Sequence, residues 1–242
     1  MKRVYFKIIF FLFSVSTCNA YSQVNCTVPL PPVFTLASVI PETEMTELNW
    51  TLSPSTDIAA YILYTYKDGD GMAFDTIWNP LATSYSFNSS ATKYYSVSYV
   101  IAAYRSPVIS GMPGCPSQLS NAINTIFTIT DIDTCNQKIV VSWNSYPSTP
   151  KNVTGYSVLV SVNGSIFADA VTVNPGMNNF TLNDFTTDAD YCFVVRANLE
   201  GGAFSTSNKA CLLTKMQRPP QWINADYASV NTDNQISLSF NI

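Results

Sequence analysis

The chain has 242 residues and a formal net charge of −4, and only 12% of its residues are charged. It contains no histidine, which excludes Ser-His and Cys-His nucleophilic sites and most zinc sites, because each of them needs a neutral imidazole. Its basic residues form no cluster after the first seven positions, so we expect neither nucleic acid nor an anionic membrane surface as a partner.

The first 20 residues predict a secretory signal peptide. A basic start precedes an apolar core at Ile8–Val15 and a small-residue cleavage site at Cys18–Ala20. Cleavage after Ala20 leaves 9 Lys and Arg against 16 Asp and Glu, a net charge of −7. The apolar core is shorter than the roughly 20 residues of a membrane span, so the cleaved chain is expected to be secreted or at the cell surface without inserting into a membrane. Val15–Cys18 also resembles a lipid-attachment box, which keeps lipidation of Cys18 as an alternative.

Residues 28–128 predict a first set of strands. In Thr46–Ser53 the apolar residues Leu48, Trp50 and Leu52 alternate with polar ones, which is the period of a half-buried strand. Asp68–Gly71 has the composition of a hairpin turn. The predicted strands are Val33–Ile40, Thr46–Ser53, Ile58–Lys67, Met72–Trp78, Thr83–Asn88, Tyr94–Tyr104 and Ala122–Thr128.

Residues 129–214 repeat this order. Trp50 and Trp143 lie 93 residues apart, and self-similarity at such a period indicates tandem domains. The second copy is predicted to contain strands that include Ile139–Trp143, Tyr156–Val160, Ile166–Val173, Phe180–Leu182, Tyr191–Asn198 and Ser207–Thr214. Residues 220–242 predict two strands of a third copy. Because two strands cannot bury an apolar face, we expect the chain to be the first part of a longer protein.

The spacing of aromatic residues resembles that of fibronectin type III domains, with Trp ending the second strand, Tyr in the third and Tyr opening the sixth. Trp50 to Tyr61 is 11 residues and Trp143 to Tyr156 is 13. Tyr191, six residues after Phe185, matches the tyrosine corner of that family.

The first copy departs from this pattern in its sixth strand. That strand is predicted to be two residues longer, and nine extra residues follow it before Ser120-Asn121 realigns with Ser207-Asn208. The alignment of Tyr94 or Tyr95 with Tyr191 is therefore left open.

The resemblance implies an all-β chain of tandem seven-stranded immunoglobulin-like sandwiches. The repeats are also similar to those of large secreted surface proteins of Bacteroidetes, in which such repeats precede a gliding-motility-associated sorting domain that this chain does not contain. The implied function is a non-catalytic spacer or adhesion module of a larger exported protein. The alternative is an accessory region of a secreted carbohydrate-active enzyme whose catalytic domain lies beyond residue 242.

The sandwich topology also suggests how the cysteines pair. Cys26 and Cys115 are placed at the same end of the first sandwich, so we pair them. Cys192 and Cys211 lie at equal distances from Gly201-Gly202 and would face each other across a hairpin. Cys135 is left over, although a Cys135–Cys211 bridge stays open as an alternative.

Three pairs of acidic residues are the remaining candidates for a metal or catalytic site: Asp68/Asp70, Asp131/Asp133 and Asp188/Asp190. None has the spacing of a calcium loop, and we interpret all of them as turn residues that bond the local backbone. We propose no catalytic residue, no metal site and no cofactor.

Strand alternation predicts one candidate binding face. If Tyr61 and Tyr95 point into the first sandwich, then the tyrosines Tyr64, Tyr66, Tyr94 and Tyr104 point outward together with Ile62 and Val100. The matching face of the second copy would be Ser157, Leu159, Ser161, Val194 and Arg196. Exposed tyrosines suit contact with a surface protein or a glycan. Ordinary strand composition, or packing against the next domain or the loop Arg105–Leu119, would also explain them.

Overall fold

The structure is a computed structural model that describes residues 26–107, 114–148, 150–215 and 224–241. The predicted signal peptide and the lipidation alternative at Cys18 lie outside these residues. In the described part of the chain, the regular elements are strands and two short 3-10 helices, η1 (Ser90–Lys93) and η2 (Glu200–Gly202). No helix among these residues is long and apolar enough to cross a membrane. The predicted all-β class is confirmed.

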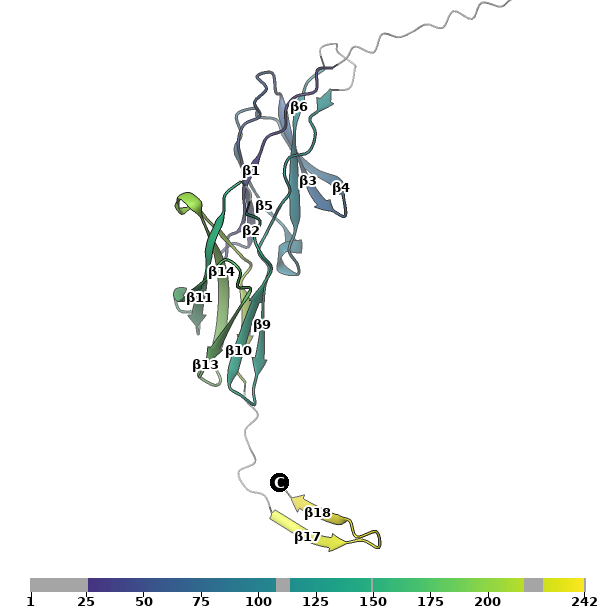
Figure 1. Cartoon of the computed structure of the whole chain (residues 1–242), viewed down its shortest axis with the longest axis vertical. Coiled ribbons are helices and arrows are strands. Elements are labelled where there is room, and N and C mark those ends of the chain that lie inside the picture. The colour runs from purple at the N-terminus through teal and green to yellow at the C-terminus, as the bar shows by residue number, and fades with distance from the viewer. Residues whose placement is uncertain (1–25, 108–113, 149, 216–223, 242) are drawn as a thin grey trace, which may run out of the picture.

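The first sandwich packs a three-stranded sheet against a larger one (Figure 1). The smaller sheet has the order β1-β2-β5, and the larger has β4-β3-β6-β7 with β8 also paired to β6. The strands are β1 (Phe34–Val39), β2 (Met45–Trp50), β3 (Ala60–Lys67), β4 (Asp70–Ile77), β5 (Ser84–Asn88), β6 (Ser98–Arg105), β7 (Cys115–Pro116) and β8 (Ile123–Asn124).

The second sandwich repeats this topology and is stacked on the first along the long axis of the molecule (Figure 1). Its sheets have the orders β13-β10-β9 and β12-β11-β14-β15, with β16 also paired to β14. This strand order makes both sandwiches fibronectin-type-III-like. The strands are β9 (Thr128–Asp133), β10 (Lys138–Trp143), β11 (Val153–Val162), β12 (Ala168–Val173), β13 (Asn179–Asn183), β14 (Asp190–Leu199), β15 (Phe204–Thr206) and β16 (Ala210–Leu213).

The repeated Trp and Tyr form the same core contact in both sandwiches. The ring centroids of Trp50 and Tyr61 are 5.8 Å apart, and those of Trp143 and Tyr156 are 5.6 Å apart. All four side chains are at most 5% exposed. Each tyrosine hydroxyl also accepts a backbone N–H from the residue three positions after the tryptophan: Ser53 N–H at 3.0 Å and Tyr146 N–H at 2.8 Å. The core residue therefore also fixes the loop that follows the second strand of each sandwich.

The Ser-Asn pair that realigns the two copies has one structural role in both. The amides of Asn121 and Asn208 bond both the N–H and the C=O of the first-strand residues Phe34 and Thr128. Each amide thus replaces two backbone partners at the edge where the two sheets meet. The predicted realignment of Ser120-Asn121 with Ser207-Asn208 is confirmed by these bonds.

The sixth strand of the first sandwich begins later than predicted. The strand β6 starts at Ser98 rather than Tyr94, because η1 and the bonds from the N–H groups of Tyr94 and Tyr95 to Ala91 O hold these residues outside the sheet. The Ser120 and Ser207 hydroxyls accept the N–H groups of Ile101 and Val195, which makes these two residues equivalent. Val97 therefore occupies the position of Tyr191.

The tyrosine corner is found in the second sandwich, at the residue whose spacing predicted it. In the second sandwich the Tyr191 hydroxyl accepts the Thr186 N–H at 3.0 Å. Tyr95, which was expected to point into the first sandwich, is 57% exposed.

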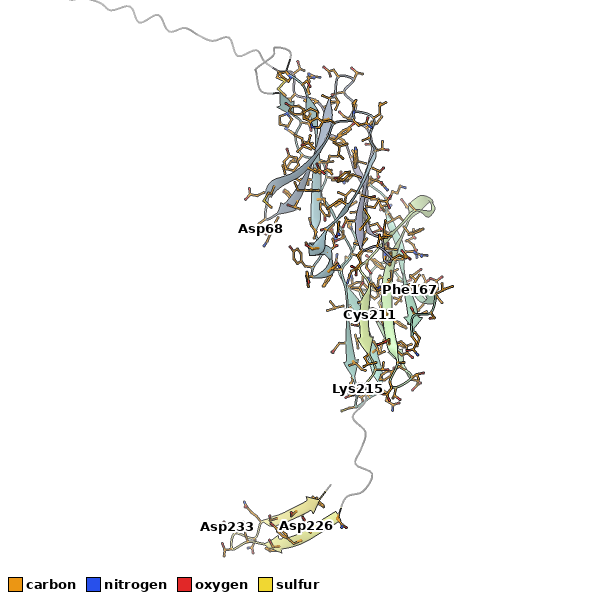
Figure 2. The ribbon with its side chains drawn as sticks, turned by 180° about the vertical axis from the view of Figure 1, so that it is seen from behind. Asp68, Phe167, Cys211, Lys215, Asp226 and Asp233 are labelled. Carbon is orange, nitrogen blue, oxygen red and sulfur yellow. A yellow bond between two sulfur atoms is a disulfide. The ribbon has the colours of Figure 1, made fainter. Side chains whose placement is uncertain are left out.

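Two disulfides join the residue pairs that the sequence suggested. Cys26 bonds Cys115, and Cys192 bonds Cys211, its direct partner in the register of β14 and β16 (Figure 2). Cys135 is free and exposed in the turn between β9 and β10, so the Cys135–Cys211 alternative is wrong. Cys192 and Cys211 face each other across the ladder with their Cα atoms 4.0 Å apart, and their bond leaves Cys211 no thiol for Cys135.

The last described residues form a two-stranded sheet of β17 (Asn224–Val230) and β18 (Ile236–Asn241). Its larger apolar side chains are all more than half exposed: Tyr227, Val230, Ile236, Leu238 and Phe240. An isolated hairpin with an uncovered apolar face is marginally stable in water.

Removing the hairpin should therefore leave the two sandwiches unchanged. We expect truncation after Thr214 to shift the thermal unfolding midpoint by less than about 2 °C, since Thr214 retains the bonds of its hydroxyl to Thr186 and Ala189. Calorimetry of the full and truncated chains measures this. A drop of many degrees would mean that the hairpin packs on the second sandwich.

Candidate functional site

The predicted tyrosine face lies on the outer side of the β3–β6 sheet. Tyr64 pairs with Val100 and Tyr66 with Ser98, while Tyr104 lies opposite Ala60. The alternating residues Tyr61 and Leu63 are at most 1% exposed in the core, so the three tyrosines point away from it. The structure thus brings Tyr64, Tyr66 and Tyr104 together on one face.

Tyr94 does not belong to this face. It caps the end of η1, before β6 begins, and is 74% exposed. The prediction placed it on the sheet because it continued the strand four residues too far. Val100, also predicted to be exposed, is only 1% exposed.

Part of the face is covered by the chain segment that leads to β8. A Cβ built on Gly71 would lie 3.4 Å from Leu119 Cδ1 and 3.5 Å from Tyr64 Cδ1, so both side chains lie beside Gly71. Burial raises the pKa of Tyr64 above its ordinary value. Packing by the long loop, one of the open explanations, therefore accounts for some of the tyrosine enrichment.

Trp78 is the residue of this face that the sequence did not identify. It follows β4, and its indole is 68% exposed and meets the Tyr104 ring edge-on at a centroid distance of 5.8 Å. The strand containing it was predicted, but its facing was not, because the β3–β4 register shifts between Leu63 and Tyr64. The aromatic face is hereafter Tyr64, Tyr66, Trp78 and Tyr104.

The corresponding face of the second sandwich is not exposed as predicted. Leu159 and Val194 are 7% and 2% exposed, and Ser157 and Ser161 are also buried. Leu159 and Val194 line a groove whose other wall comes from the first sandwich, including Leu36 of β1. Alternation along β11 and β14 predicts which side of the sheet these residues face, and not how deeply they are buried there.

The two sandwiches are joined at the open edge of β1. This strand pairs only with β2, so the backbone groups along its other edge need partners. Ala37 N–H donates to the Tyr146 hydroxyl at 2.9 Å, and the Ser205 hydroxyl donates to Ala37 C=O at 2.7 Å. The Thr206 hydroxyl donates to Val39 C=O at 2.5 Å. Side chains of the second sandwich thus satisfy this edge of the first.

Two further contacts complete what we call the joint. The Thr206 N–H donates to the Ser38 hydroxyl at 2.9 Å, and the hydroxyls of Ser38 and Thr206 are 2.9 Å apart. Ala37, Ser38, Ser205 and Thr206 are all at most 8% exposed. Burial also raises the pKa of Tyr146 to about 12, the dominant effect over its hydrogen bonds. Each of these polar groups would be costly to separate from its partner without water taking its place.

Among the acidic pairs, the carboxylates of Asp131 and Asp133 bond the local backbone. The Asp133 carboxylate accepts the N–H groups of Cys135 and Asn136 and the Asn136 side-chain amide, which lower its pKa. Asp131 is a strand residue of β9 instead of a turn residue. Asp68 lies at the tip of the β3–β4 hairpin (Figure 2). The described residues contain no group of three side chains suited to hold a metal ion.

Comparisons with known proteins give fold-level similarity. No family model matches the chain, and no curated protein matches it. The fibronectin domains FN1–FN3 of chicken CNTN1 align at 14% identity and a TM-score of 0.31, over 77% of this chain and 66% of theirs. A two-domain fibronectin type III segment of chicken tenascin aligns at 18% identity and a TM-score of 0.30, over 77% of this chain and 99% of the segment. The twitchin kinase region of C. elegans aligns at 16% identity and a TM-score of 0.30, over 42% and 18%.

The joint predicts the effect of removing one hydroxyl. Tyr146→Phe leaves the buried Ala37 N–H without its acceptor, and we expect this to lower the free energy of unfolding by about 1–3 kcal/mol. Urea denaturation measures the loss. Tyr94→Phe is the control, because Tyr94 is exposed and should change nothing. An unchanged Tyr146→Phe protein would show that the joint contributes no stability.

The raised pKa of Tyr146 also predicts a pH dependence. A tyrosine has a pKa of about 10 in an unfolded chain, against about 12 for Tyr146 here, so its contribution is fully present below pH 10 and is lost as the pH rises from 10 to 12. The wild type should therefore lose stability more steeply than Tyr146→Phe in this range. Denaturation curves between pH 8 and 11.5 measure the difference, and parallel losses would contradict the assignment.

Proposed function

We propose that the chain is a non-catalytic spacer and adhesion module of an exported surface protein. The joint is the observation that carries this proposal, because it fixes two sandwiches end to end through buried hydrogen bonds. Domains linked by a polar, mobile interface would not keep a binding face at a set distance and angle. Fibronectin-type-III-like domains generally serve as spacers or adhesion modules.

Two features support the exported location. Two disulfides suit an oxidising compartment, where such bonds persist. The predicted signal peptide provides the route out of the cytoplasm. We propose further that the chain is part of a longer exported surface protein of the kind found in Bacteroidetes.

The adhesive surface we propose is the aromatic face of the first sandwich. Trp78 is its exposed residue and Tyr104 lies half-buried beside it. Aromatic side chains of this kind supply both contact area and a polar group to a surface protein or a glycan. The matching positions of the second sandwich offer no comparable surface, since Ser157, Leu159, Ser161 and Val194 are at most 8% exposed and Arg196 is half-buried. The first sandwich is therefore the binding domain and the second the spacer.

A pair of variants tests this assignment. We expect Trp78→Ala/Tyr104→Ala to weaken binding about tenfold or more, since truncation of an aromatic anchor often costs an interface about 2 kcal/mol. A glycan array and a panel of purified extracellular proteins identify the ligand with the wild-type chain first. Tyr94→Ala is the matched control, because this exposed tyrosine lies in the same domain but off the face.

Two outcomes would contradict the proposal. Unaltered binding by the double variant would show that these aromatic residues reflect only the ordinary composition of strands. Equal losses in the double variant and in Tyr94→Ala would place the binding surface elsewhere on the first sandwich.

A further inference from the structure

A groove of about 850 Å³ lies between the two sandwiches, beside the joint. One wall is the outer face of β11 and β14, and the other is the β1 edge of the first sandwich. Its apolar lining includes Leu36, Ile40, Leu159, Phe167, Val194 and Phe204. Phe167 projects from the side of the second sandwich (Figure 2). A cavity of this volume at a domain boundary has the size and position typical of small-molecule sites.

The uncharged polar groups of the lining are already engaged within the protein. The hydroxyls of Ser38 and Thr206 bond each other in the joint, and the Ser165 hydroxyl accepts the Val162 N–H at 3.0 Å. The edge groups of β1 at Ala37 and Val39 are occupied by the second sandwich, so this strand does not offer them to an extended peptide. The groove is therefore complementary to an apolar ligand rather than to the main chain of a peptide.

Arg196 is the exception among the lining residues. It projects from β14, and its guanidinium carbon lies 4.4 Å from the centroid of the Phe204 ring. Its Nε is buried and has no hydrogen-bond partner in the described residues. The two ion pairs found in the described part of the chain involve Lys93 and Arg105, so Arg196 has no carboxylate there either. A buried donor left unpaired is costly, and a planar guanidinium can bind a carboxylate through two parallel N–H bonds.

The other charged residues of the groove lie on opposite walls, with the basic one on the second sandwich and the acidic ones on the first. Lys209 lies on the same domain as Arg196, whereas Glu42 and Glu47 belong to the first sandwich. The Glu47 carboxylate accepts the Asn49 amide at 3.2 Å. Lys93 and, to a smaller extent, Lys209 lower the pKa of Glu44, so Lys209 already lies near an acidic side chain. An anionic group is therefore favoured beside Arg196.

We propose that the groove binds a small amphipathic carboxylate, with its carboxylate on the Arg196 guanidinium and its apolar body between the two sandwiches. The two terminal nitrogens of the Arg196 guanidinium would donate to the two carboxylate oxygens. The hydrocarbon part would lie against Phe167 and Phe204 on one side and Leu36 on the other. This site is separate from the aromatic face and does not depend on it.

Isothermal titration of the full chain with decanoate and with decanol tests the proposal. We expect decanoate to bind at least about tenfold more tightly than decanol, because only the carboxylate can form charge-assisted bonds to Arg196. Arg196→Gln should weaken decanoate about tenfold and leave decanol unchanged. Trp78→Ala/Tyr104→Ala should bind decanoate like the wild type, which separates this site from the adhesive face.

A second variant keeps the test valid if Arg196→Gln fails to fold. Ile166 also lines the groove and is 93% exposed, so Ile166→Asp can place a negative charge at the rim without disturbing the core. It should weaken decanoate more than decanol, and near-ultraviolet circular dichroism checks that the fold is kept. Equal affinities for the two ligands, an unaffected Arg196→Gln protein, or binding of an acidic apolar peptide without any binding of decanoate would each overturn the proposal.

Discussion

The open edge of β1 is the constraint on which the arrangement of this protein depends. An edge strand presents backbone donors and acceptors that must be bonded, covered or left in water. Here Tyr146, Ser205 and Thr206 of the second sandwich bond them. Because these groups are buried, separating the sandwiches would leave several backbone donors and acceptors of β1 without their partners at once. The same contact brings the groove walls together and sets where the aromatic face points.

The joint depends on a hydrogen bond that both sandwiches share. In each copy the core tyrosine bonds the residue three positions after the tryptophan, which is Ser53 in the first sandwich and Tyr146 in the second. The shared bond fixes the loop, and the side chain at that position decides what the loop does next. Ser53 bonds locally to Leu30 C=O, whereas the longer Tyr146 reaches across to Ala37. One substitution within a repeated frame thus turns a loop into an interdomain contact.

The parts of the structure that rest on local pattern could be predicted from sequence. Alternation around Trp50 and Trp143 predicted the cores, and the equal spacing from Gly201-Gly202 predicted the Cys192–Cys211 bridge. The start of β6 could not be found in this way, because a 3-10 turn continues the aromatic pattern outside the sheet. Trp78 was missed because a bulge shifted its register.

The properties of the groove between the domains could not be predicted from the sequence, for a different reason. Leu159 and Val194 line the groove between the sandwiches and are at most 7% exposed, and nothing in their own strands indicates this burial. Arg196 was placed on an outer face, which is correct within its sheet, but the burial of its Nε depends on the side chains around it, such as Phe204, which strand alternation does not describe. Contacts of this kind are set by tertiary arrangement rather than by strand period.

A direct measure of the distance between the two sandwiches tests the joint most clearly. Spin labels at Ser86 and Thr181, which are exposed on β5 and β13, can be attached through cysteine substitutions in a Cys135→Ser background. Pulsed electron spin resonance of this double-labelled chain should give one narrow distance distribution that does not change with temperature. A broad or multiple distribution would show that the domains move independently and that the hydrogen bonds at β1 do not fix them.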